Sequence, residues 1–134
     1  MRVNKKGLSF ITIMIVIALF ALALRFGIER ILKITIKQND AFAQATLKLI
    51  SAALENYAKD NNGVFPDDLS VLTKNNPPYL DKDYIMDSPL KGYEYDCQRL
   101  DQTGYNCQAS PVNCKLTGKK IYTVSTGGLI ISED

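Results

Sequence analysis

Three cysteines, Cys97, Cys107 and Cys114, are the residues of this chain whose chemistry can be predicted most directly, and all lie in its last third. In an oxidising compartment two of them would pair. A hairpin turn near residues 100–103 would place Cys97 opposite Cys107 on one face of two strands. The segment CQASPVNC also allows Cys107 to pair with Cys114. Three thiols without a bridge are the third alternative.

The chain of 134 residues contains no histidine. This absence removes the usual general base and the commonest zinc ligand, and so excludes Ser-His, Cys-His and most metallohydrolase mechanisms. No Cys-x-x-Cys pair is present, so neither a zinc knuckle nor a thioredoxin-like site is predicted. We therefore expect no enzyme, no catalytic residue, no cofactor and no bound metal.

Charge is distributed unevenly along the chain. Residues 1–61 hold nine Lys and Arg against four Asp and Glu, about +5, whereas residues 62–134 hold seven against ten, about −3. An acidic C-terminal part repels phosphate backbones, and only Lys115, Lys119 and Lys120 approach a basic patch. No nucleic-acid partner is expected.

An uninterrupted apolar run extends from Leu8 to Leu24, with Ser9 and Thr12 as its only polar residues and no charge. As a helix, its 17 residues would span about 26 Å, slightly less than the roughly 30 Å hydrocarbon core of a bilayer. Arg25 can extend the span by placing its charge at the interface. We expect a single membrane-spanning helix whose short N-terminal segment stays in the cytoplasm, because a long downstream domain is translocated largely regardless of its charge.

A cleavable secretory signal is the alternative interpretation of this run. The segment Ala21–Ala23 has the small-x-small pattern that signal peptidase recognises, after a basic and an apolar region of suitable length. Cleavage there would release a secreted protein beginning at Leu24. Against this alternative, no proline and only Gly27 interrupt residues 8–61, so the helical pattern continues past the candidate cleavage position.

The second half of this helix is predicted to be amphipathic. Apolar residues recur at intervals of four, three, four and three: Ala43, Leu47, Ile50, Leu54 and Tyr57. Ser51 and Glu55 fall elsewhere on the helical wheel, and Glu55 is expected to pair with Lys59. Asn61, Asn62 and Gly63 then predict a left-handed stop, so that one helix of about 54 residues is expected.

The remaining residues predict a small antiparallel sheet. Pro66 is expected to start a short helical turn, with Phe65, Leu69 and Leu72 as its apolar contacts. Beyond residue 92 the apolar pattern changes to period two, and a Gly-Gly turn separates the last two of four short strands. A sheet of this size buries one face, so the predicted fold class is α+β, with a long N-terminal helix packed against a β-sheet head.

Several segments together resemble a known family. They are KKG followed by LSFI, then ALENYAKDNNGVFPDDLSVL, and later DSPLKGYEY. In this order, across the whole chain, they are similar to the class III signal and body of type IV pilins and type II secretion pseudopilins, and most similar to the major pseudopilins.

The resemblance implies a processing site at Lys5, Lys6, Gly7 and Leu8. In the family, prepilin peptidase, an aspartyl protease of the inner membrane, cuts after the glycine on the cytoplasmic side. Leu8 would then become an N-methylated N-terminus. A glycine permits an extended backbone in a protease cleft, and the lysines hold the site at the cytoplasmic face. Only the leader would be lost, and the apolar helix would be kept.

Two positions depart from the family pattern. Five residues after the glycine the family usually has a glutamate, which is thought to pair with the N-terminal amine of a neighbouring subunit, whereas this chain has Thr12. A hydroxyl cannot neutralise a buried ammonium, so weaker subunit docking is implied. The calcium-binding loop found in many major pseudopilins is not recognisable after Thr117. We interpret the scattered aspartates as a solvated acidic face: Asp67, Asp68, Asp81, Asp83 and Asp87.

The implied function is that of a structural subunit of a type II secretion pseudopilus or type IV pilus. Its segments would be the leader at 1–7, the membrane and filament-core part of the helix at 8–30, its amphipathic part at 31–61 and the head at 62–134. The expected location is a bacterial inner membrane, with the head in the periplasm. Expected partners are other pilin-like subunits in a filament, the prepilin peptidase, the inner-membrane assembly platform and lipid. A minor tip subunit acting in adhesion or DNA uptake is the alternative.

Overall fold

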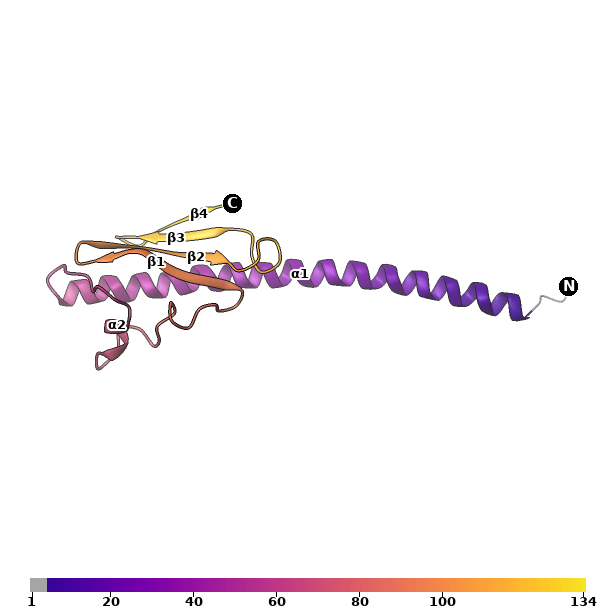
Figure 1. The fold of residues 1–134 in the computed structure, drawn as a ribbon, viewed down its shortest axis with the longest axis horizontal. Helices are drawn as coiled ribbons and strands as arrows, with labels where there is room; N and C mark the ends of the chain where they lie inside the picture. Colours follow the sequence, from indigo (N-terminus) through magenta and orange to yellow (C-terminus); the bar gives the residue numbers. More distant parts are fainter. Residues whose placement is uncertain (1–4) are drawn as a thin grey trace. The chain divides into compact units, whose positions relative to one another are not determined.

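The computed structural model describes the backbone from Lys5 to Asp134 and the side chains from Ser9 onward. Its elements (Figure 1) are, in order, α1 (Lys5–Asp60), α2 (Ser70–Lys74), β1 (Tyr93–Asp101), β2 (Gly104–Pro111), β3 (Ile121–Ser125) and β4 (Leu129–Glu133). The four strands form one antiparallel sheet in the order β1-β2-β3-β4. This α+β arrangement of one long helix and a small meander confirms the predicted fold class.

The chain divides into two compact units, one ending at Ile34 and the other spanning Thr35–Asp134. The second unit combines the amphipathic part of α1 with α2 and the sheet. In Figure 1 the sheet lies alongside this part of α1.

Helix α1 ends where the sequence predicts a left-handed stop. Asn62 and Gly63 have φ values of 59° and 81°. The Gly63 amide donates to the Ala58 carbonyl at 2.7 Å, which satisfies one of the last carbonyls of the helix. The helical turn expected at Pro66 is instead α2, which begins at Ser70. The Ser70 amide donates to the Asp68 carboxylate at 3.2 Å, so a side chain two residues back closes the turn that leads into α2.

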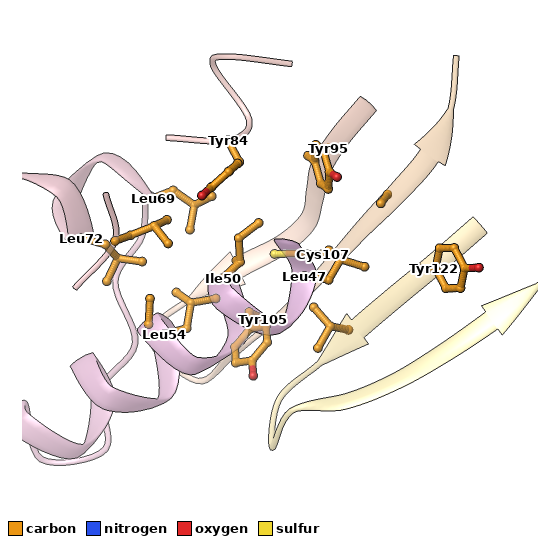
Figure 2. Close-up of a cluster of buried hydrophobic side chains, with 14 of the residues drawn as sticks. Leu47, Ile50, Leu54, Leu69, Leu72, Tyr84, Tyr95, Tyr105, Cys107 and Tyr122 are labelled. Carbon is orange, nitrogen blue, oxygen red and sulfur yellow. The ribbon is translucent and has the colours of Figure 1, made fainter. Parts of the chain in front are cut away.

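The core of the second unit forms around the predicted apolar stripe of α1 (Figure 2). Leu47, Ile50 and Leu54 are buried, together with Ala43. Their partners come from α2 and the residue before it, from the following loop and from the inner face of the sheet: Leu69, Leu72, Tyr84, Tyr95, Tyr105, Cys107, Tyr122 and Val124. The 3.6-residue period gives the helix one apolar face, and the two-residue period gives the strands another. These two faces pack against each other.

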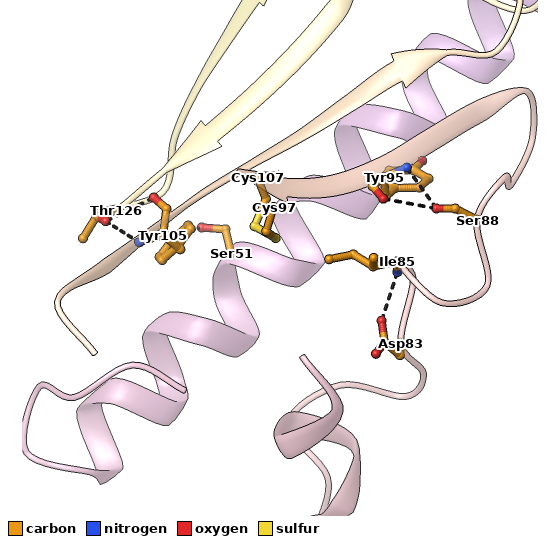
Figure 3. The surroundings of a disulfide bond; sticks show 9 residues. All are labelled: Ser51, Asp83, Ile85, Ser88, Tyr95, Cys97, Tyr105, Cys107 and Thr126. Carbon is orange, nitrogen blue, oxygen red and sulfur yellow. Dashed lines mark hydrogen bonds between the residues drawn. A yellow bond between two sulfur atoms is a disulfide. The ribbon is translucent and has the colours of Figure 1, made fainter. Parts of the chain in front are cut away.

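Strand register decides which cysteines pair. Cys97 on β1 lies opposite Cys107 on β2, and the two form a disulfide (Figure 3). The hairpin turns just after Asp101, whose carboxylate accepts the Thr103 amide at 2.8 Å. Cys114 is exposed and outside the disulfide. In a chain-entropy model, closing a loop of this length stabilises the fold by about 3 kcal/mol.

Two polar residues of α1 do not lie where the helical wheel suggested. Ser51 is buried and Glu55 is half-buried. The Tyr105 hydroxyl, from β2, donates to the Glu55 carboxylate at 2.8 Å, and it lies 2.8 Å from the Ser51 hydroxyl. Because a phenol has one proton, Ser51 must be the donor in that second bond. Glu55 also accepts the Gly127 amide at 2.7 Å, in the turn between β3 and β4. The expected pair of Glu55 with Lys59 is therefore replaced by a network that joins α1 to the sheet.

This network predicts a loss of stability at alkaline pH. Burial raises the pKa of the Tyr105 phenol to about 12; Ser51 opposes this rise and the Glu55 carboxylate adds to it. Tyr105 therefore stabilises the fold fully below its unfolded pKa of about 10, and this contribution is lost as the pH rises through the folded pKa. The urea concentration at the midpoint of denaturation should therefore decrease as the pH is raised from about 9 to about 11.5. It should fall less in Tyr105→Phe, which has no proton to lose there. An equal fall in both proteins would contradict the role of Tyr105.

Candidate functional site

The candidate site is the segment of α1 between Ser9 and Ile34, which is uncharged up to Leu24 and contains four charged residues beyond it. Every large apolar side chain of this segment is solvent-exposed, from 36% at Leu32 to 69% at Phe26. These side chains point to all sides of the helix, because apolar residues occupy nearly every position up to Leu24. A helix that is apolar all round requires an apolar surrounding, which is either lipid or other helices.

The sequence of this segment favours an unbroken helix that can cross a membrane. Within the described residues, the helix that includes Ser9–Asp60 is the one long and apolar enough to do so, with a mean hydropathy of 2.5 in its most apolar window. Gly27, the single glycine of Ser9–Asp60, has no other side chain within 4 Å of the position that a Cβ would take. Length and composition thus agree with a single-pass membrane protein. A cleavable signal sequence shares these two properties.

The predicted processing residues lie at the start of α1. The backbone of Lys5, Lys6, Gly7 and Leu8 is within the first turns of this helix. Their side chains lie outside the described part of the structure, as do residues 1–4 of the predicted leader. Thr12 is exposed one turn further along, among exposed apolar side chains. The predicted processing residues and the predicted assembly position therefore lie on the same helix.

The cysteines do not belong to this segment. The Cys97–Cys107 disulfide lies in the second unit, against the core side chains of the sheet (Figure 3). Exposed Cys114 is near Lys115, Lys119 and Asp134. Cys97 and Cys107 therefore stabilise the head, whereas Cys114 takes no part in the disulfide.

The predicted acidic face consists largely of residues that hold turns. The Asp83 carboxylate accepts the Ile85 amide at 3.0 Å (Figure 3) and the Met86 amide at 3.2 Å. The Asp81 carboxylate accepts the Tyr84 hydroxyl at 3.0 Å. Between Lys5 and Asp134, no three Cys, Asp or Glu side chains gather closely enough to hold a metal ion.

Sequence reasoning missed the structural role of Ser51 and Glu55, which join α1 to the sheet through the Tyr105 hydroxyl and the Gly127 amide. The available signal was their position directly beside the apolar stripe, where a polar side chain can reach the edge of a packed sheet. Comparisons of the chain with models of known protein families, with curated proteins and with solved structures found no match.

Proposed function

We propose that this chain is the precursor of a structural filament subunit, similar to type IV pilins and type II secretion pseudopilins. In this proposal prepilin peptidase removes residues 1–7, and the apolar half of α1 then remains as the membrane segment and later as the filament core. Apolar side-chain packing between subunits would drive assembly. The chain itself would perform no chemistry.

The observation that carries the proposal is the exposure of every large apolar side chain from Phe10 to Ile34. Within the second unit, the apolar stripe of α1 is covered by the sheet and by α2. An apolar helix that continues directly into a folded head suits a subunit that is stored in a bilayer and then transferred to a bundle of similar helices. The proposed location is a bacterial inner membrane, with the N-terminus in the cytoplasm and the head in the periplasm.

The N-terminus of the mature protein tests this function. We expect N-terminal sequencing and intact-mass measurement to find Leu8 carrying a methyl group. A mature chain that begins at Leu24 would show that the apolar run is a secretory signal, and the proposal would then fail. A chain that still begins at Met1 would show an ordinary membrane anchor without pilin-type processing.

Thr12 supports a second candidate, a minor subunit at the filament tip. In the middle of a filament, the N-terminal amine of each incoming subunit would lie next to Thr12 of the neighbouring subunit. Threonine cannot neutralise that charge, whereas a tip subunit has a neighbour on one side only. The tip subunit would act as a binding module rather than as a repeating unit.

We therefore expect Thr12→Glu to increase self-assembly. A carboxylate at this position would form a charge-assisted pair with the neighbouring amine, and such pairs contribute about 1.5–3 kcal/mol, or roughly a tenfold to hundredfold gain in association. Chemical cross-linking of membranes and quantification of sheared fibres measure the effect. Thr12→Gln is the uncharged control of similar shape. If Thr12→Gln assembled as well as Thr12→Glu, charge pairing would not be the cause.

A further inference from the structure

The head has an open depression of about 470 Å³ at the C-terminal end of α1. One wall is formed by the last residues of α1 and the other by the loop that follows α2. Its polar and aromatic lining consists of Tyr57, Asp60, Asn61, Asn75, Asn76 and Tyr79, completed by two prolines. This volume is within the range of ligand-binding sites for small molecules, about 300–1,000 Å³.

The two tyrosines of the depression are held in place by the fold. Their rings pack edge to face, with centroids 5.6 Å apart and an interplanar angle of 75°. The Tyr79 hydroxyl donates to the Asp60 carboxylate at 2.6 Å, and the Tyr79 amide donates to the Leu72 carbonyl at 2.9 Å. Leu72 is itself buried in the core. The loop is therefore fastened to both helices, and a ligand would meet a largely preformed surface.

Several polar groups of the lining are available to a ligand. Asn75 and Asn76 are exposed, and within the described residues their side chains make no hydrogen bond to the protein. Each amide offers two donor hydrogens and an acceptor oxygen, and the Asp60 carboxylate offers acceptors beyond the one used by Tyr79. Among the described residues, neither lysine nor arginine lines the depression. The site therefore combines donors and acceptors with a single negative charge.

We propose that this depression binds an uncharged saccharide. The C–H groups on one face of a sugar ring carry partial positive charge and pack on the negative face of an aromatic ring, which Tyr57 and Tyr79 provide. Neighbouring hydroxyls act as both donor and acceptor, as do the amides of Asn75 and Asn76, while Asp60 accepts. An anionic sugar would be repelled by Asp60 with no cation in the lining to compensate. This inference is independent of how the N-terminus is processed.

Nuclear magnetic resonance titration of the full chain tests the inference. The protein is placed in phospholipid nanodiscs, because alkyl glycoside detergents carry a sugar headgroup that would compete. Methyl glucoside, methyl galactoside, N-acetylglucosamine and lactose are added in turn, with glucuronate as the anionic comparison. We expect at least one neutral sugar to shift the side-chain amide signals of Asn75 and Asn76, with a Kd of about 1 mM, and glucuronate to bind at least about tenfold more weakly.

Three variants test whether the sugar binds in the depression: two alter its lining and one is a control outside it. Tyr79→Ala should weaken binding about tenfold through loss of the stacking surface. Asn75→Ala, at an exposed position without a hydrogen bond to the protein, should weaken it about fivefold while leaving the fold intact. Asn56→Ala, exposed on α1 outside the depression, should bind like the unaltered protein. The inference is overturned if no neutral sugar shifts these signals, if Asn75→Ala binds as tightly as the control, or if glucuronate binds equally well.

Discussion

The Gly7→Leu variant is expected to accumulate as an uncut precursor in the membrane. Residues 5–8 are helical in the structure, and a protease binds its substrate as an extended backbone, so this turn must unwind before cleavage. Glycine lowers the cost of unwinding by about 1 kcal/mol relative to a good helix former. Leucine would stabilise the helix and also add a side chain next to the bond to be cut.

Intact-mass measurement of membrane fractions gives the outcome directly, because the precursor and the processed chain differ by residues 1–7. Gly27→Ala is the matched control on the same helix. A Cβ at Gly27 meets no other side chain within 4 Å, so this variant should be processed normally. Normal cleavage of Gly7→Leu would count against pilin-type processing.

The Leu47→Ala variant is expected to lose about 2–5 kcal/mol of the free energy of unfolding of the head. Leu47 is fully buried, at 0% exposure, on the stripe of α1 that the sheet covers. Removal of its side chain leaves a cavity between helix and sheet that close-packed neighbours cannot fill. Because the loss is a large fraction of the stability of a small domain, part of the variant protein should be unfolded at physiological temperature.

Urea denaturation followed by near-ultraviolet circular dichroism isolates this effect. The chain has no tryptophan, and its seven tyrosines all belong to the second unit, so the tyrosine signal reports on the head. Leu49→Ala is the control, since Leu49 is on the same helix and is 53% exposed. We expect it to change stability by less than about 0.5 kcal/mol. Equal losses in the two variants would show that the buried stripe does not hold the head together.

The order and type of the main elements could be predicted from local patterns. The spacing of Leu47, Ile50 and Leu54 predicted the buried stripe, and Asn62 and Gly63 predicted the end of α1. The strands followed from alternation of period two. The prediction that the short helical turn starts at Pro66 was wrong. Proline suits the first turn of a helix, but the Asp68 carboxylate closes a turn before the helix, so α2 begins at Ser70.

The sequence by itself determined where an apolar helix occurs, that its second half has one buried face, and that two cysteines could approach each other. These properties depend on neighbours a few positions apart along a helix or hairpin. Only the tertiary structure decided that Cys107 pairs with Cys97, because a shift of strand register by one residue would place one of the cysteines on the opposite face. It also decided that Glu55 binds Tyr105, 50 positions away, instead of Lys59. The physical reason is that a polar side chain beside a packing interface bonds to whichever group the folded sheet brings to it, and one-dimensional periodicity does not contain that information.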